Sequence, residues 1–228
     1  MVCAAIAEAA ALTPMAARAQ VALGLSAATD YRIRGVSLSE RRPAATISLT
    51  DDFANGVYAG VVAVAQDAPD SHIRFMGHQE YLGYARRMDD GLTWEVGLDN
   101  QHYEGYGPTP PRLNYTEAYA GLSGRVLSAR LYYSPNYNGS DHNIAYFETN
   151  AVVRPADGWR VTGHAGVLQP LNSWPFVARR PRYDGRVEVI RSLGRVEVSL
   201  GWAGATPSVR PDPKRSNGGV ILGASVYF

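Results

Sequence analysis

From Val21 onward, apolar and polar residues alternate with a period of two along most of the chain. Residues 93–99, 128–133 and 195–202 show this most clearly, with every second residue apolar and the intervening ones polar, charged or glycine. Successive side chains of a β-strand point to opposite faces, so this pattern predicts strands with one apolar and one polar face. No stretch of comparable length has a period of 3.6, which predicts an all-β fold.

Turn-forming residues divide the chain into about twelve predicted strands. Connections after even-numbered strands are short, as in Asp89-Asp90, whereas those after odd-numbered strands are long and rich in Pro, Gly and Asn, as in 105–112. This regular asymmetry is typical of a transmembrane antiparallel up-and-down β-barrel with short periplasmic turns and long extracellular loops. The predicted strands are 21–33, 43–51, 56–66, 74–88, 91–104, 113–123, 125–135, 142–154, 158–169, 182–192, 195–205 and 217–228.

The alternation leaves open whether the apolar face points into a soluble barrel or out to lipid. The polar face is too charged for a dry interior, because unpaired buried charges are costly. We therefore expect lipid outside and an aqueous lumen inside. Tyr31, Trp94, Trp159 and Trp202, near the ends of apolar faces, fit interfacial aromatic girdles. The predicted pore-lining residues are Asp30, Arg32, Arg34, Glu80, Glu95, Asp99, Glu117, Arg130, Glu148, Arg160, Arg186, Glu188 and Glu197.

Composition narrows the functional classes. The net charge is +1, which argues against a nucleic-acid partner. No run of 18 apolar residues without a charge occurs, so no transmembrane helix is expected. If a signal peptide is cleaved after Ala19, the mature chain loses the only cysteine, Cys3, which excludes a disulfide scaffold, a thiol nucleophile and a cysteine-ligated metal site. We predict no metal and no cofactor.

The two ends of the chain carry candidate targeting signals. Residues 1–19 are Ala-rich and end in Ala17-Arg18-Ala19, a form that signal peptidase reads, although Glu8 interrupts the apolar run. We predict a signal peptide over 1–19, with a helical extension as the alternative, and a single barrel domain over 20–228. The predicted membrane-insertion signal, read by the barrel-insertion machinery, is the alternating face of Val220, Leu222, Ala224, Val226 and the terminal Phe228. An ordinary last strand is the alternative.

Several segments resemble the TorF-type porins of Gram-negative bacteria. The first is Ser26-Ala27-Ala28-Thr29-Asp30-Tyr31-Arg32-Ile33-Arg34-Gly35-Val36-Ser37, which is similar to the opening motif of that family. Weaker matches follow in order at 56–60, 80–84, 115–122 and 132–135. The resemblance implies a barrel in the outer membrane of a Gram-negative bacterium and passive transport.

The mixed charges of the polar face predict a porin-like channel with a narrow lumen through which small polar solutes diffuse. The alternative is a closed structural or interaction barrel of an envelope assembly, braced inside by Arg–carboxylate pairs. A lipid-modifying enzyme is a third alternative, but no histidine stands in a His-x-Ser arrangement, so we expect no catalytic residues and no enzyme. Expected partners are outer-membrane lipids and lipopolysaccharide, the insertion machinery and the solutes, with a homo-oligomer or a larger envelope complex left open.

Overall fold

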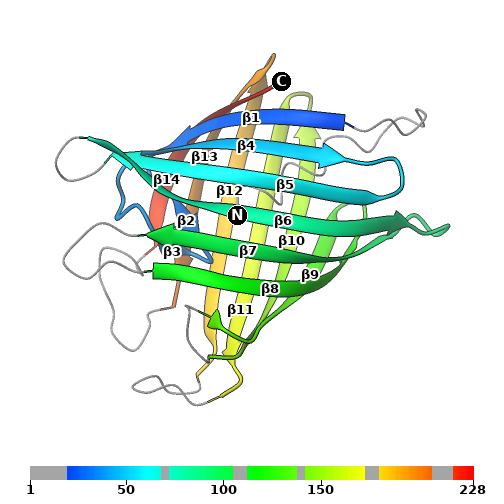
Figure 1. The fold of residues 1–228 in the computed structure, drawn as a ribbon. Coiled ribbons are helices and arrows are strands. Elements are labelled where there is room, and N and C mark those ends of the chain that lie inside the picture. Colours follow the sequence, from blue (N-terminus) through cyan, green and yellow to red (C-terminus); the bar gives the residue numbers. More distant parts are fainter. Residues whose placement is uncertain (1–19, 68–71, 105–111, 138–141, 173–179, 207–217) are drawn as a thin grey trace.

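The computed structural model describes residues 20–67, 72–104, 112–137, 142–172, 180–206 and 218–228 (Figure 1). Among them, twelve antiparallel strands close into a barrel in which each strand pairs with its neighbour along the chain and β1 pairs with β14. The wall strands are β1 (Gln20–Ala28), β4 (Ala44–Asp52), β5 (Val57–Asp67), β6 (Ile73–Arg87), β7 (Thr93–Glu104), β8 (Arg112–Ser123), β9 (Leu127–Ser134), β10 (Ile144–Ala156), β11 (Trp159–Pro170), β12 (Arg182–Leu193), β13 (Val196–Ala205) and β14 (Gly219–Tyr227). The predicted fold class and strand number are confirmed.

The first predicted strand is wrong in its second half. β1 ends at Ala28 rather than at residue 33, and the chain then leaves the wall. Residues 30–43 carry two short strands, β2 (Arg32–Ile33) and β3 (Val36–Ser37), which pair only with each other. Figure 1 shows them behind the front wall, within the outline of the barrel and near the end where β1 stops. We call residues 30–43 the inner hairpin.

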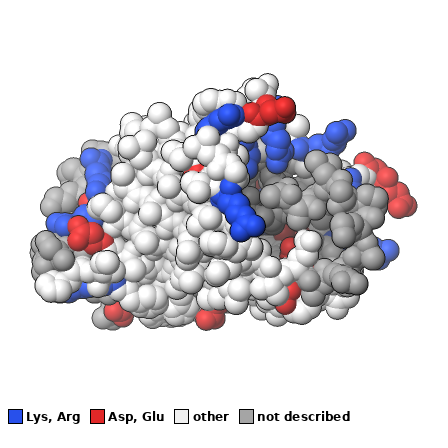
Figure 2. All heavy atoms as spheres, turned by 90° about the horizontal axis from the view of Figure 1, so that it is seen from above, with Lys and Arg blue, Asp and Glu red and all other residues white. Residues whose placement is uncertain are grey.

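The outer face of the barrel is apolar. Val220, Leu200 and Leu222 expose 66%, 53% and 54% of their surface on neighbouring strands, with Leu200 opposite Leu222 in the ladder. The last strand therefore presents its alternating apolar face to the outside, as expected, whereas its reading by insertion machinery stays a prediction. Figure 2 shows one side of the barrel, where a broad surface without charged side chains lies between charged groups toward the two ends. This distribution is that of a lipid-facing belt between two aqueous ends.

None of the described residues belongs to a helix that is long and apolar enough to cross a membrane. Residues 1–19 lie outside the described residues, so the signal peptide also stays a prediction.

Inside the barrel, tyrosine rings lie across glycines of the neighbouring strand. Tyr119 is paired with Gly97, and a Cβ atom built on Gly97 lies only 2.4 Å from the Tyr119 hydroxyl. Tyr58 covers Gly83 in the same way. A glycine at these wall positions removes the side chain that would hold the ring away from the backbone. The rings therefore lie close to the wall and fill the lumen along β5–β8.

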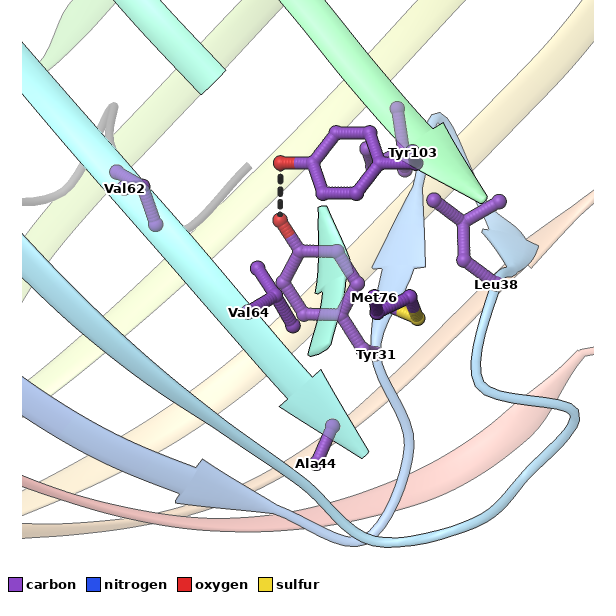
Figure 3. Close-up of a cluster of buried hydrophobic side chains, with 8 residues drawn as sticks. Tyr31, Leu38, Ala44, Val62, Val64, Met76 and Tyr103 are labelled. Carbon is purple, nitrogen blue, oxygen red and sulfur yellow. Dashed lines mark hydrogen bonds between the residues drawn. The ribbon is translucent and has the colours of Figure 1, made fainter. Parts of the chain in front are cut away.

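The inner hairpin packs against this filled side. Tyr31, Ile33 and Leu38 of the hairpin form one buried apolar cluster with Val62 and Val64 of β5, Met76 of β6 and Tyr103 of β7. In Figure 3 the rings of Tyr31 and Tyr103 point toward each other, and their hydroxyls are hydrogen-bonded at 3.0 Å. Tyr31 was predicted to lie in an aromatic girdle, which is wrong, because the hairpin carries it inside.

Candidate functional site in the barrel lumen

A carboxylate holds the inner hairpin in its folded shape. Asp30 accepts hydrogen bonds from Arg32 Nε at 2.7 Å, from the Ser37 hydroxyl and from the Ser39 hydroxyl at 3.2 Å. The Ser39 oxygen also accepts the backbone N–H of Tyr31 at 2.9 Å. All five residues are buried. A buried carboxylate that accepts several hydrogen bonds, one of them charge-assisted, orders its donors tightly, so the hairpin is a built element inside the lumen.

The tip of the hairpin is a two-residue turn, Arg34-Gly35. Both residues have positive φ, 47° and 71°, as the common tight hairpin turn requires. A Cβ atom on Gly35 would lie 2.2 Å from the Gly204 carbonyl oxygen of β13, so only glycine fits this approach to the wall. The turn therefore fixes where the Arg34 side chain starts.

Arg34 extends from this tip to β8 and β10. One Nη atom donates to Glu117 Oε2 at 2.5 Å, and the guanidinium carbon lies 3.9 Å from the centre of the Tyr146 ring. Burial lowers the pKa of Arg34, but Glu117 and the nearby tyrosines outweigh this and raise the pKa above its ordinary value. The side chain is thus a permanent positive charge in the interior.

The other predicted charges form local pairs on the wall. Arg130 binds both carboxylate oxygens of Glu95, at 2.6 and 2.9 Å, and Arg160 binds both of Glu197, at 2.7 and 3.2 Å. These bidentate pairs each join two strands, and the second joins β11 to β13 across β12. Arg186 donates to Glu188 of its own strand at 2.7 Å.

Two further predicted wall residues are buried among amides and tyrosines. Asp99 accepts hydrogen bonds from Gln79 at 2.9 Å and from Gln101 at 2.8 Å. Glu148 accepts one from the Tyr132 hydroxyl at 3.2 Å. The structure therefore places every predicted pore-lining residue on the lumen side except one.

That exception is Glu80, which was predicted to line the pore and instead lies on the outer face. Its side chain is 60% exposed and lies 3.7 Å from His78 Nε2. The neighbouring Gln79 is the residue that points inward, to Asp99. The outer face of β6–β8 is polar at this level, with Glu80 opposite Asn100 and His78 opposite His102. Glu80 was assigned to the inner face because it is polar. On these strands the outer face also carries polar side chains, so polarity alone does not identify the inner face.

The inner hairpin divides the lumen into a filled half and an open half. The filled half lies along β5–β9, where the hairpin and the tyrosines pack together. The open half is a cavity of about 160 Å³ between the hairpin, the strands β10–β14 and β1. Its charged and hydrogen-bonding lining consists of Ser26, Arg32, Arg34, Asn150, Arg160, Thr162, His164, Asp184, Arg186, Glu188, Glu197, Ser199, Ser225 and Tyr227.

His164 joins three wall residues at this cavity. Its Nδ1 lies 2.8 Å from Asn150 Oδ1 and its Nε2 lies 2.8 Å from Asp184 Oδ1, with the Tyr146 hydroxyl 3.2 Å from Nε2. Across the described part of the chain, no three His, Cys, Asp or Glu side chains are placed to hold a metal ion. The cluster can brace the wall and present a polar surface to the cavity.

The sequence patterns missed the tyrosines that surround Arg34. Tyr115, Tyr132 and Tyr146 all occupy inward positions, where a polar or charged residue was expected. A signal was present, since Tyr115, Glu117 and Tyr119 alternate along one strand and so share a face. None of these tyrosines was among the predicted pore-lining residues, which were all charged.

Known structures share this fold. A porin described as NanC aligns with a TM-score of 0.59 at 11% identity, covering 90% of this chain and 98% of its own. KdgM porin aligns with a TM-score of 0.56 at 9% identity, covering 91% and 99%. A second KdgM structure, in complex with disordered oligogalacturonate, aligns with a TM-score of 0.53 at 8% identity, covering 91% and 99%. The chain thus has the fold of outer-membrane porins, and with the apolar belt this indicates the outer membrane of a Gram-negative bacterium.

No curated protein sequence matches the chain. A family model does match, over residues 8–175, which include the inner hairpin and the barrel as far as the end of β11. The chain therefore belongs to the family described as a bacterial protein of unknown function (Gcw_chp).

Proposed function

We propose that this protein is a porin-like channel through which small polar solutes diffuse passively across the outer membrane. The observation that carries the proposal is the charged, hydrogen-bonding cavity inside a closed barrel whose outer face is apolar. The path runs through the open half of the lumen, between the inner hairpin, β10–β14 and β1. In this account the predicted pore-lining residues other than Glu80 form its wall or the hairpin that narrows it.

Size and charge set the solutes that fit. The hairpin leaves a cavity of about 160 Å³, which suits solutes no larger than a monosaccharide or an amino acid. Arg160 and Arg186 on its wall are paired with Glu197 and Glu188, so neither sign of charge dominates. A path built for polyanions would carry an excess of positive charge, which this cavity wall lacks. KdgM porin, by contrast, is described in complex with oligogalacturonate, a polyanion. We therefore propose neutral and zwitterionic solutes as the main cargo.

The second candidate is a closed barrel with a structural or interaction role in the envelope. The bidentate pairs of Arg130 with Glu95 and of Arg160 with Glu197 favour it, because they brace the wall from inside. In either role we propose contact with outer-membrane lipids and lipopolysaccharide, insertion by the barrel machinery, and no enzymatic activity. A homo-oligomer or a larger envelope complex is compatible with both.

Single-channel recording in planar bilayers tests the proposal. We expect discrete steps of small conductance, because the hairpin narrows the path, and a reversal potential near zero in a salt gradient, because the wall charges balance. Correctly folded protein that inserts but gives no steps would overturn the channel and favour the closed barrel. A strong preference for anions or cations would contradict the mixed-charge path.

A further inference from the structure

The surroundings of Arg34 have the composition of a cation-binding site. Four tyrosine rings lie around its guanidinium carbon, at 3.9 Å for Tyr146, 5.5 Å for Tyr115, 5.7 Å for Tyr132 and 5.9 Å for Tyr137, measured to the ring centres. We call these four rings the tyrosine cage. Aromatic rings within about 6 Å of a cation attract it through their negative faces, and such cages recognise alkylated ammonium groups. Solute conduction through the open half of the lumen does not require this arrangement.

Two buried carboxylates accompany the cage. Glu117 and Glu148 expose 0% and 1% of their surface. Each has one carboxylate oxygen, Glu117 Oε1 and Glu148 Oε2, without a hydrogen-bond partner among the described residues, and the same holds for Arg34 Nη1. Arg34 is ion-paired with Glu117, whereas Glu148 stands opposite Arg130 in the ladder between β10 and β9. A buried carboxylate that loses its counter-ion is strongly destabilising, so this site favours occupation by a positive charge.

The resident cation belongs to the hairpin and not to the wall. Arg34 stands at the tip of the inner hairpin, whereas the cage and Glu117 belong to β8, β9, β10 and the segment that follows β9. Arg34 also lines the open cavity. The space that its side chain fills is therefore continuous with the solute path, and a group that enters from the path can reach the cage when that side chain is absent.

We propose that the tyrosine cage is a binding site for organic cations, namely guanidinium and quaternary ammonium groups, and that Arg34 is its tethered occupant. A guanidinium group matches the carboxylate of Glu117 and the ring of Tyr146 as Arg34 does. A quaternary ammonium group makes no hydrogen bonds and depends on the rings. The site does not depend on solute conduction.

The test removes the occupant and supplies the missing group in solution. Arg34→Ala protein, folded in detergent, is titrated by calorimetry with ethylguanidinium, with tetramethylammonium and with urea, which is close to guanidinium in shape but uncharged. We expect both cations to bind, urea not to bind, and the wild type to bind none of them because Arg34 fills the cage. Thermal unfolding of the variant is expected to shift upward with either cation at concentrations that leave the wild type unchanged.

Arg160→Ala is the matched control. Arg160 also lines the cavity and binds one glutamate through two bonds, but its only described hydrogen-bond partner is Glu197. We expect ethylguanidinium to bind Arg34→Ala at least about tenfold more tightly than Arg160→Ala, which corresponds to the contribution of a desolvated cation–π contact. Equal affinity in the two variants, equal binding of urea, or no binding by Arg34→Ala would overturn the proposal.

A second variant serves if Arg34→Ala does not fold alone. Arg34→Ala/Glu117→Gln removes the acid that pairs with Arg34 while it keeps the four rings and Glu148. We expect this protein to bind tetramethylammonium and to bind ethylguanidinium more weakly than it binds tetramethylammonium. Recovery of Arg34→Ala folding by ethylguanidinium supports the site, whereas absence of tetramethylammonium binding by the double variant contradicts it.

Discussion

Replacing residues 29–43 by a four-residue turn is expected to raise the single-channel conductance about two- to threefold, because the inner hairpin lines the open cavity and narrows it. The wall tolerates the change, since Ala28 of β1 and Ala44 of β4 are directly paired and a short turn can join them. Thr29 is the one residue of the segment whose backbone N–H bonds to the last strand, at the Leu222 carbonyl. The measurement is recording in planar bilayers beside the wild type.

The control for this change keeps the hairpin and loosens one contact. Tyr31→Phe removes the hydroxyl that is hydrogen-bonded to Tyr103 and leaves the apolar packing in place. We expect its conductance to match that of the wild type. An unchanged conductance in the shortened chain, with a folded barrel by circular dichroism, would show that the hairpin does not limit the path.

The second large effect concerns the outer face. Leu200→Arg is expected to lower the free energy of unfolding in lipid vesicles by about 2–4 kcal/mol, because it places a charge among acyl chains. Leu200 is 53% exposed and lies between Val189 and Leu222, two other outward apolar residues. Ser199→Arg, one residue away, faces the cavity and is expected to cost less than about 1 kcal/mol.

Denaturant unfolding of the two variants in the same vesicles gives the comparison. Each substitution adds the same charged side chain to the same strand, so the two variants differ mainly in the face of β13 that carries the charge. Equal loss of stability in Leu200→Arg and Ser199→Arg would mean that the two faces of β13 meet similar surroundings, which contradicts a lipid-facing belt.

Much of the wall follows from the sequence because its physical cause is local. A strand that separates lipid from water must alternate, so the period of two in segments such as 195–202 marks both the strand and its faces. The short turns likewise carry their own signals, since Gly91, Gly158 and Gly194 all have the positive φ that tight turns need. Strand number and the order of neighbouring strands follow from these local signals, whereas closure also needs the pairing of β1 with β14.

The contents of the lumen depend on contacts between distant residues, and the sequence pattern misses them. Asp30, Arg32 and Arg34 continue the alternation of the first strand, so they were expected on its inner face. They lie off the wall on a hairpin that is held inside the barrel by contacts with distant residues. Arg34 forms an ion pair with Glu117, 83 residues away, and the Tyr31 hydroxyl is hydrogen-bonded to that of Tyr103. No local pattern distinguishes an arginine on a wall from an arginine on a hairpin that folds inside.

Glu80 lies on the wall, as predicted, but on the opposite face from the one predicted. Polarity identifies the inner face only where the outer face is uniformly apolar, and on β6–β8 it is not. Glu80 stands opposite Asn100, and Asn100 donates a hydrogen bond to Thr116 at 2.9 Å on the same outer surface. Both faces of these strands are polar at this level, so the alternation no longer determines which side a residue takes.

Thiol labelling of neighbouring positions on β13 tests the assignment of the two faces most directly. Ser199→Cys and Leu200→Cys are each made in a chain whose Cys3 is replaced by serine, and the proteins are folded into lipid vesicles. A small charged, water-soluble thiol reagent is predicted to modify Ser199→Cys, in the lumen, and to leave Leu200→Cys unmodified among the lipids. Modification of Leu200→Cys with protection of Ser199→Cys would contradict a barrel whose apolar face meets the membrane and whose charged face encloses water.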